Sequence, residues 1–551
     1  MSNTTAIIAP LMGPAAALQT ACASALGAGA DYIEFRIDVI NDDAAVTAAI
    51  RAHPKARVVL TARCPTEGGA TADDDERRAE RLTAALAAAL ENPDRPEWRR
   101  SISGDHKALP PILVDIEAAT WRRSSTARAT IATAIRAQTN HTGLILSRHY
   151  FDRPHWLDEP DPIAAATREL RDLDSVAAEA SRESGAVSAV PKLAITVRDA
   201  RDSFAILAAL QARAAPTIAI AMGESGLAAR VLAPRYGGAL AYAPVEADQA
   251  SAPGQLTIAV MRDRYRFDET NLSTGVFGVI GWPVSHSRSP QLHNAAMRAA
   301  GIGGVFTPMP TPPTADALAA FLTLIEEHPR LGVRGMSVTI PHKQHALRFV
   351  QQRGGALSGL AEKCGAINTL SFNPDETPQW RGDNTDAIAA RDAMRDAIGD
   401  DVLQQAPVRI LGAGGAARAV ITALLGVGCK ITVMNRSEEP AVQLAAALGC
   451  AQAPWEQRNT RFAGVIVNCT PIGMTPHVTE TPVSADALTG AVAVFDTVYT
   501  PAETRLLREA RAAGVRTISG VEMFIRQAAA QFELWHKAIA PLDCFRPILT
   551  E

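Results

Sequence analysis

The sequence lacks several features that mark particular classes of protein. Its seven cysteines contain no CxxC pair, and its cysteines and histidines show no cluster with the spacing of metal ligands. We therefore predict no metal site. Scattered cysteines in an odd number favour reduced thiols over disulfides, so we expect a cytoplasmic protein.

A strong charge of one sign and a long apolar run are also absent. The formal net charge is -4 over 551 residues, which gives no reason to expect nucleic acid or an anionic membrane as a partner. No apolar run is long enough to cross a bilayer. Residues 5–30 carry no charge, but no basic residue precedes them and Gly13-Pro14 interrupts them. A strand and a helix are expected there, not a signal peptide.

Short apolar runs alternate with amphipathic segments through the first half of the chain. Segments such as 74–91 and 199–213 have the spacing of amphipathic helices. The strand candidates are 5–9, 32–37, 57–62, 112–116, 144–146, 192–196, 217–222 and 239–242. Eight alternations of this kind in roughly 250 residues predict an α/β fold, a (β/α)8 barrel.

One of these runs contains a lysine. Residues 189–196 read AVPKLAIT, with Lys192 among apolar neighbours. Burying an ammonium group costs several kcal/mol unless the charge is paired or lost, so burial favours the neutral amine, a nucleophile toward ketones. An edge-strand lysine that reaches water is the alternative, and this run alone favours it.

Polar residues near the ends of the other runs reverse that preference. A lysine, a histidine, several acids and several arginines at one barrel mouth suit an amine nucleophile with a general base and an anion clamp. These residues are Glu34, Arg36, Asp38, Arg63, Glu67, Asp115, Glu117, His149, Lys192 and Arg230.

Six motifs in this half occur in a recognisable order. They are EFRID at 34–38, TAR at 61–63 followed by EGG at 67–69, VDIE at 114–117, SRHYFD at 147–152, PK at 191–192 and ASAPGQ at 250–255. Together they resemble type I 3-dehydroquinate dehydratase over essentially the whole first half. Tyr242 departs from the pattern, because phenylalanine is expected there.

The resemblance implies a role for each residue. Lys192 would form an imine with the substrate ketone, His149 would move the proton, and Glu67 would orient His149. Arg230 would bind the substrate carboxylate. The remaining contacts would come from Glu34, Arg36 and Arg63 at the substrate hydroxyls and from Ser251 and Gln255 in a loop that could close over the site.

The second half contains a different set of polar motifs. Ser287 and Ser289 lie in a Gly/Pro-containing loop before a helix, where hydroxyls can face an anion, although N-cap serines would look the same. Lys343 is expected near a helix N-terminus, which the helix dipole disfavours. Asp386 could pair with it, and such a pair can pass a proton to or from a carbonyl oxygen.

A glycine-rich turn between an apolar strand and an alanine-rich helix suggests a dinucleotide site. The turn reads GAGGAAR at 412–418, and the next strand, 430–434, ends in Asn435-Arg436-Ser437 with no acid. An acid there would bind the 2′-hydroxyl of NAD, whereas an arginine suits the 2′-phosphate of NADP. We therefore predict NADP as the cofactor.

These pieces together resemble shikimate dehydrogenase across the second half. Further matching stretches are NCTPIGM at 468–474, DTVYTP at 496–501 and GVEM at 520–523. The resemblance implies Lys343 and Asp386 as the catalytic pair. It implies substrate contacts from Ser287, Ser289, Thr339, Asn368, Tyr499 and Gln527. It implies NADP contacts from Gly412, Gly414, Gly415, Asn435, Arg436, Ser437, Met474 and Gly520. Ala387 departs from the usual glycine.

The sequence thus predicts a bifunctional enzyme in the fusion order of the plant enzymes. The first half would convert 3-dehydroquinate to 3-dehydroshikimate, and the second would reduce that product to shikimate with NADPH. The expected division is a barrel over 1–260, a linker over 261–274, a substrate-binding domain over 275–388 completed by 521–551, and a Rossmann-type domain over 389–520. Three alternatives stay open: a lysine-dependent aldolase in the first half, a quinate dehydrogenase in the second, or one half that is an inactive scaffold.

Overall fold

The computed structural model describes residues 5–90, 109–137 and 141–550, and the chain divides into two compact units. The first unit comprises the chain up to Gly275 with Gly303–Pro310 and Glu327–Gly332, and the second comprises the rest. Among the helices in these described ranges, none has the length and apolar content that a membrane span requires.

The first unit contains the expected barrel. Parallel strands follow one another in the order β7-β6-β5-β4-β3-β2-β1-β8, and the β1–β8 pair brings the sheet round on itself. An isolated bridge between Thr217 and Gly238 completes the ring. The strands are β1 (Ala6–Leu11), β2 (Tyr32–Arg36), β3 (Val58–Thr61), β4 (Ile112–Glu117), β5 (Thr142–Tyr150), β6 (Ala189–Thr196), β7 (Ile218–Met222) and β8 (Leu240–Tyr242).

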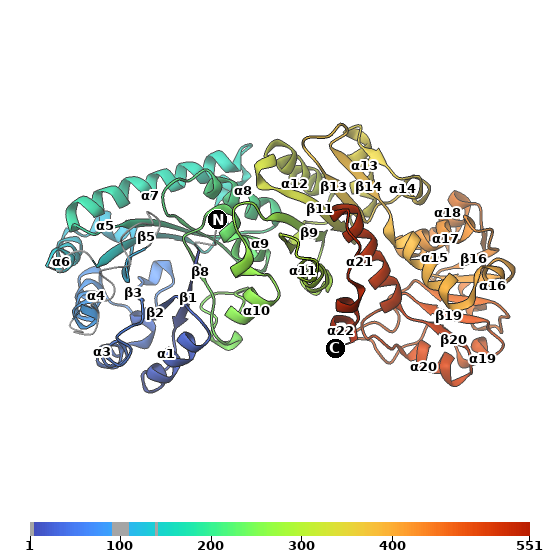
Figure 1. Ribbon diagram of the computed structural model, residues 1–551, viewed down its shortest axis with the longest axis horizontal. Coiled ribbons are helices and arrows are strands. Elements are labelled where there is room, and N and C mark those ends of the chain that lie inside the picture. The colour runs from blue at the N-terminus through green and yellow to red at the C-terminus, as the bar shows by residue number, and fades with distance from the viewer. Residues whose placement is uncertain (1–4, 91–108, 138–140, 551) are drawn as a thin grey trace. The chain divides into compact units, whose positions relative to one another are not determined.

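Helices cover the outside of these strands (Figure 1). The longest of them shows why the chain is helical there: Asp161 caps the first turn by accepting from the Ala164 N–H, and Gly185 ends the helix in the left-handed region. The helices are α1 (Leu18–Gly27), α2 (Ile37–Ile40), α3 (Asp43–Ala52), α4 (Asp75–Leu90), α5 (Ala118–Arg123), α6 (Ser125–Arg136), α7 (Pro162–Ser184), α8 (Ala200–Gln211), α9 (Leu227–Val231) and α10 (Ile258–Asp263).

The interior of the barrel is built in layers. One apolar core cluster takes a residue from every strand: Ile8, Tyr32, Val59, Leu113, Ile145, Val190, Ile218 and Leu240. Because alternate side chains in a strand point the same way, residues two positions further along also point inward. That next layer contains Glu34, Thr61, Asp115, Ser147, Lys192 and Tyr242. The apolar layer closes the bottom, and the polar layer above it forms the floor of a site.

Strand β5 is longer than the sequence predicted. It continues past Leu146 through Tyr150, so His149 belongs to the strand and does not follow it. Pairing with β6 explains the extension, because His149 lies opposite Ala194 in the ladder. The segment expected as a linker begins in α10, and its Tyr265 and Phe267 are buried.

The second unit begins with a mixed sheet that supports a cleft. Its strands β9, β11, β13, β14 and β12 are successive neighbours, with β9 and β11 parallel and β13 antiparallel to both of its neighbours. The strands in this part of the chain are β9 (Gly275–Gly281), β10 (Gly304–Pro310), β11 (Val333–Val338), β12 (Ala356–Leu357), β13 (Thr369–Phe372) and β14 (Trp380–Asp383). The helices are α11 (Ser289–Ala299), α12 (Ala315–Glu327), α13 (Lys343–Gln352) and α14 (Gly359–Cys364).

A parallel sheet follows, with the strand order β17-β16-β15-β18-β19-β20 of a doubly wound nucleotide-binding fold. Its strands are β15 (Val408–Leu411), β16 (Ile431–Met434), β17 (Ala451–Gln452), β18 (Val465–Asn468), β19 (Ala493–Asp496) and β20 (Arg516–Ile518). The remaining helices are α15 (Thr385–Ile398), α16 (Asp400–Gln405), α17 (Gly415–Leu425), α18 (Glu438–Leu448), α19 (Ala485–Leu488), α20 (Arg505–Ala512), α21 (Gly520–His536) and α22 (Phe545–Thr550). Helix α15 packs against both α17 and α21. The expected fold class, a (β/α)8 barrel followed by α/β domains that include a Rossmann-type sheet, is confirmed.

Candidate active sites

A cavity of about 90 Å³ lies at the mouth of the barrel. All the residues to which the resemblance gave a role in the first half line it: Glu34, Arg36, Arg63, Glu67, His149, Lys192, Arg230, Ser251 and Gln255. Asp38, Asp115 and Glu117, which the sequence also placed at the mouth, are not among its lining residues. Tyr242, which the sequence marked only as a departure, lines it too. Strand periodicity and barrel closure therefore bring together side chains that are far apart in the sequence.

Lys192 is buried at the floor of this cavity. Its Nζ donates to Asp115 Oδ2 at 2.8 Å and to the Tyr242 hydroxyl at 2.9 Å. Burial lowers the pKa of the Lys192 amine below its ordinary value, and Arg63 acts in the same direction, against the attraction of Asp115. Lys192 therefore gives up its proton more readily than a surface lysine does, and its neutral amine is more populated.

Asp115 connects Lys192 with its neighbours. Its carboxylate accepts from Ser147 Oγ at 2.6 Å and from Arg63 Nη2 at 3.0 Å. Burial alone would favour the neutral acid, but the charges of Lys192 and Arg63 hold the pKa of Asp115 well below its usual range. Asp115 is therefore a permanent anion beside the amine. The sequence had placed it near the site without a role, because its pairing with Lys192 depends on the register across the barrel.

His149 is held by two charged neighbours through one ring nitrogen. Its Nδ1 lies 3.0 Å from Glu67 Oε2 and 2.8 Å from Arg63 Nη1. Burial, followed by Arg63 and Lys192, lowers the pKa of His149 well below its ordinary value, so the imidazole is neutral. Burial and the nearby Glu117 raise the pKa of Glu67 to about 7. With the proton on Nδ1, the N–H donates a hydrogen bond to an ionised Glu67 and Nε2 is the basic nitrogen. A hydrogen bond from Arg63 Nη1 needs the Nδ1 lone pair and belongs to the other tautomer.

Arg230 is a buried cation in this wall. Its Nε donates to the Ala221 carbonyl at 3.1 Å and its Nη2 to the Pro253 carbonyl at 2.9 Å. Across the described ranges, no carboxylate forms an ion pair with Arg230, and burial lowers its pKa to about 10. A buried guanidinium without an anionic partner suits a carboxylate brought by a ligand. Ser251 and Gln255, joined to each other by hydrogen bonds, lie in the same wall.

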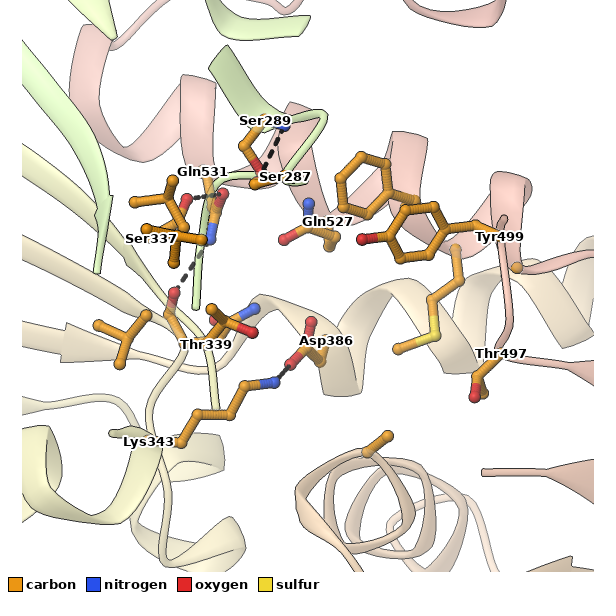
Figure 2. Close-up of a pocket in the computed structure, with 18 of the residues that line it drawn as sticks. Ser287, Ser289, Ser337, Thr339, Lys343, Asp386, Thr497, Tyr499, Gln527 and Gln531 are labelled. Carbon is orange, nitrogen blue, oxygen red and sulfur yellow. Dashed lines mark hydrogen bonds and ion pairs between the residues drawn. The ribbon is translucent and has the colours of Figure 1, made fainter. Parts of the chain in front are cut away.

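The second unit has its own cleft, of about 330 Å³. Figure 2 shows Lys343, Asp386 and Gln527 facing one open space, with Ser287 and Tyr499 at its margins. Every residue that the sequence assigned to substrate or catalysis in this half lines it: Ser287, Ser289, Thr339, Lys343, Asn368, Asp386, Tyr499 and Gln527.

Two helix N-termini position Lys343 and Asp386, the pair that the sequence predicts to be catalytic. Lys343 is the first residue of α13, and its Nζ lies 2.5 Å from Asp386 Oδ2 in the first turn of α15. Asn384 caps α15 by accepting from the Ala387 N–H. The Asn368 amide oxygen accepts from the Thr385 N–H at 2.8 Å, so this side chain also fixes the start of the helix. Both caps place the Asp386 carboxylate opposite the lysine.

Two residues that line the cleft, Gln531 and Phe524, were not predicted from the sequence. Gln531 lines it and accepts from Ser337 Oγ at 2.7 Å, and its amide nitrogen donates to the Thr369 hydroxyl at 3.0 Å. Phe524 stacks on Tyr499 with ring centroids 4.4 Å apart. Both residues lie in α21, whose helical period toward Gln527 was the signal that could have identified them.

Family models of known proteins match both halves of the chain. Residues 7–94 and 106–272 match the family model described as type I 3-dehydroquinase. Residues 279–370 match the substrate-binding domain of shikimate dehydrogenase, 395–467 match shikimate / quinate 5-dehydrogenase, and 520–549 match the C-terminal domain of shikimate 5'-dehydrogenase.

Shikimate dehydrogenase (NADP(+)) of Methanosarcina acetivorans is 38% identical over 285 residues, which cover 50% of this chain and 98% of that protein. The chain belongs to the shikimate dehydrogenase family. The bifunctional 3-dehydroquinate dehydratase/shikimate dehydrogenase of Arabidopsis thaliana, a chloroplastic protein, is 35% identical over 399 residues. That alignment covers 70% of this chain and 64% of the plant protein, less than two thirds of its length. Both resemblances drawn from the sequence are confirmed.

Solved structures also align with the second half. Shikimate 5-dehydrogenase from Thermus thermophilus, crystallised with NADP(H) and shikimate, is 31% identical, with a TM-score of 0.44. The match covers 50% of this chain and 98% of that one.

The glycine turn of this shikimate dehydrogenase half has a shape that fits a dinucleotide. Gly412 has φ +108, and a Cβ there would lie 2.9 Å from the Cys469 carbonyl oxygen, so only glycine fits. Gly414 precedes α17, and no side chain caps that helix, whose first residue is Gly415. Uncapped N–H groups at a helix start are suited to a pyrophosphate.

The other residues assigned to the nucleotide lie around this turn. Arg436 is exposed after β16, and no hydrogen bond or ion pair to another described side chain engages its guanidinium. Asn435 donates its amide N–H to the Ser437 carbonyl, which shapes the turn. Met474 is 44% exposed in the segment after β18. Gly520 lines the cleft, where a Cβ would lie 2.3 Å from the Val498 carbonyl oxygen.

Proposed function

We propose that this protein converts 3-dehydroquinate to 3-dehydroshikimate in its barrel and reduces 3-dehydroshikimate to shikimate with NADPH in its second unit. The observation that carries the proposal is that each cavity keeps a complete reactive pair. Lys192 and His149 line one cavity, and Lys343 and Asp386 line the other. An inactive scaffold would have no need to keep both pairs.

In the barrel, neutral Lys192 would attack the substrate ketone and form an imine. Protonation of the imine makes an electron sink that acidifies the neighbouring C–H. His149 would remove that proton through Nε2 and return it to the leaving hydroxyl, which departs as water. Arg230 would hold the substrate carboxylate, and hydrolysis of the imine would release the product. The arginine and the Ser251–Gln255 contact are the features that favour a dehydratase over an aldolase.

In the second unit, the groups of the cleft would control a proton at the substrate carbonyl oxygen. NADPH, when bound, supplies the hydride. Lys343 and Asp386 together would deliver a proton to the oxygen that becomes a hydroxyl. Ser287 and Ser289 would hold the substrate carboxylate, and Tyr499 and Gln527 would hold the substrate hydroxyls. The N-terminus of α17 would hold the pyrophosphate, and Arg436 would favour the 2′-phosphate of NADP.

The proposal is tested by assaying the two reactions in sequence on the whole chain. With 3-dehydroquinate alone, we expect the ultraviolet absorbance of the conjugated enone to rise. On addition of NADPH, both the enone and the NADPH absorbance should fall as shikimate forms. Absence of the enone signal would refute the assignment of the barrel. Formation of the enone without NADPH oxidation would refute the assignment of the second unit. Quinate offered in place of shikimate with NADP should be turned over more slowly.

The location of the protein remains part of the proposal. All seven cysteines are free, which fits a reducing compartment such as the cytoplasm. Of the residues that the structure describes, no group of three or more His, Cys, Asp or Glu side chains could hold a metal ion. The partners that the two proposed reactions require are small molecules: the two keto acids, shikimate and NADP.

Glu67→Gln should change the pH dependence of the dehydratase. Because the pKa of Glu67 is about 7, wild-type kcat/KM should fall as the pH drops through that value, when Glu67 binds a proton and no longer accepts from His149. The variant should lose activity by roughly 10- to 100-fold and lose this acid limb as well. A pH–rate profile from pH 5 to 9 measures both. An unchanged acid limb in the variant would assign the titration to another group.

Arg436→Ala should narrow the preference for NADP over NAD. A lost charge-assisted contact to a phosphate costs about 1.5–3 kcal/mol, so the ratio of kcat/KM values for the two nucleotides should fall by roughly 10- to 100-fold. Shikimate oxidation with each nucleotide measures the ratio, and Arg461→Ala provides an exposed arginine as control. An unchanged ratio would place the 2′-phosphate elsewhere.

A further inference from the structure

Tyr242 contacts the amine of the barrel site. It is the last residue of β8 and points inward, two positions beyond Leu240 of the apolar layer. Its hydroxyl lies 2.9 Å from Lys192 Nζ, and Nζ lies 4.4 Å from the centre of its ring. The contact depends on a tyrosine, because phenylalanine would keep the ring and lose the hydroxyl.

The groups near Nζ differ in whether they can accept a proton, donate one, or do both. Among the described side chains, Asp115 and Tyr242 are the two that form hydrogen bonds with Nζ. The Asp115 carboxylate is an acceptor, and Arg63 beside it is always a donor. His149 is engaged through Nδ1 by Glu67 and Arg63, and among the described contacts it forms no hydrogen bond with Nζ. A phenol can accept one proton while it donates another.

The phenol stays neutral in this position. Burial, followed by the carboxylates of Glu34 and Asp115, raises the pKa of Tyr242 well above its ordinary value. A free phenolate is therefore disfavoured, and a concerted transfer that keeps the oxygen neutral is favoured. The carbon that bonds to Nζ, and the oxygen on that carbon, lie within two bonds of Nζ. That oxygen is consequently within reach of a hydroxyl already in contact with Nζ.

We propose that Tyr242 is a further catalytic residue of the barrel, whose hydroxyl passes protons from Lys192 Nζ to the ketone oxygen while the imine forms. This inference rests on the proposed role of Lys192. As Nζ bonds to the carbonyl carbon, the π electron pair moves to oxygen. The oxygen takes the phenol proton while the phenol oxygen accepts one from Nζ.

A second transfer of the same kind completes the reaction. The nitrogen lone pair forms the C=N bond, the C–O bond breaks, and the oxygen receives the phenol proton and leaves as water. The phenol again accepts a proton from Nζ. The two transfers convert amine and ketone to a neutral imine and one water, and the imine then takes a proton from solvent to become the electron sink.

The test is the rate at which the imine appears at Lys192. Full-length protein is mixed with 3-dehydroquinate and quenched with borohydride at successive times, and the reduced adduct on the Lys192 peptide is measured by mass spectrometry. Tyr242→Phe should slow labelling at saturating substrate by roughly 10- to 100-fold. The substrate concentration that gives half of the maximal rate should stay within about twofold, because the ring and the binding groups remain.

Tyr32→Phe is the matched control. It also removes one buried tyrosine hydroxyl from the barrel, but that hydroxyl donates to the Pro110 carbonyl in the layer below the site. We expect this variant to label at the wild-type rate. Thermal unfolding followed by circular dichroism shows whether each variant is folded, and its labelled peptide at long times must still be the one containing Lys192.

The possible outcomes separate the proposed role of Tyr242 from the proposed role of Lys192. A Tyr242→Phe protein that labels as fast as the wild type overturns the relay. A raised half-saturating concentration with an unchanged maximal rate also overturns it, since the hydroxyl would then only bind substrate. Absence of adduct in the wild type overturns the proposed role of Lys192 itself, whatever Tyr242 does.

Discussion

Lys192→Ala is expected to abolish dehydration of 3-dehydroquinate, with a loss on the order of 10⁴-fold or more in kcat, because removing the nucleophile removes the covalent route. The geometry leaves no substitute for this amine. Arg36, Arg63 and Arg230 are the other Lys or Arg side chains that line the cavity, and a guanidinium is not deprotonated at neutral pH. The enone absorbance that 3-dehydroquinate produces measures the loss.

The same preparation supplies its own control. Shikimate oxidation by the second unit should remain within about twofold of wild type, since its cleft contains no residue of the barrel. Lys192→Met keeps most of the side-chain volume and should lose as much dehydratase activity as the alanine variant. Arg63 and Ser147 still compensate the Asp115 carboxylate in both variants. A Lys192→Met protein with a tenth or more of wild-type activity would contradict the covalent mechanism.

Asp386→Asn is expected to have the opposite effect on the two activities. The amide keeps the size of the carboxylate but removes the charge that holds Lys343 and its proton in the cleft. Loss of one positioned acid–base group costs roughly 10²- to 10⁴-fold in rate, so kcat for shikimate oxidation should fall by that amount. NADPH absorbance at saturating shikimate and NADP measures it.

Folding is expected to survive the Asp386→Asn change. The N-cap of α15 is Asn384, and its contact with the Ala387 N–H does not involve the carboxylate. The lost interaction with the helix dipole costs only about 0.3–1 kcal/mol. Dehydration by the barrel should be unaffected, and Asp392→Asn, on the same helix but outside the cleft, provides a control. Wild-type oxidation by Asp386→Asn would show that Lys343 acts without this partner.

The sequence alone predicted most of the barrel, because its strands are short apolar runs separated by helices with clear caps. Lys192 was visible as a charge inside such a run. The end of β5 was less visible: its last residues, Arg148 to Tyr150, are polar and read as a loop. The ladder with β6 decides their conformation, and a ladder between segments far apart in the chain leaves no local signal.

Contacts across the barrel were the part that the sequence could not give. Asp115 and Lys192 are separated by 77 positions, and their contact depends on both strands presenting the same layer inward. The contact between Tyr242 and Lys192 has the same origin. In the second unit the resemblance identified the predicted site residues. Gln531 and Phe524 were identified only from the structure, in which α21 lines the cleft.

The measurement that tests the central claim most directly is the identity of the residue that carries the substrate. The protein is incubated with 3-dehydroquinate, reduced with borohydride until the reaction is complete, digested, and its peptides are weighed. We predict one modified peptide, the one that contains Lys192, with the mass of the reduced adduct. Unmodified protein, or an adduct on any other lysine, would contradict the account of the barrel.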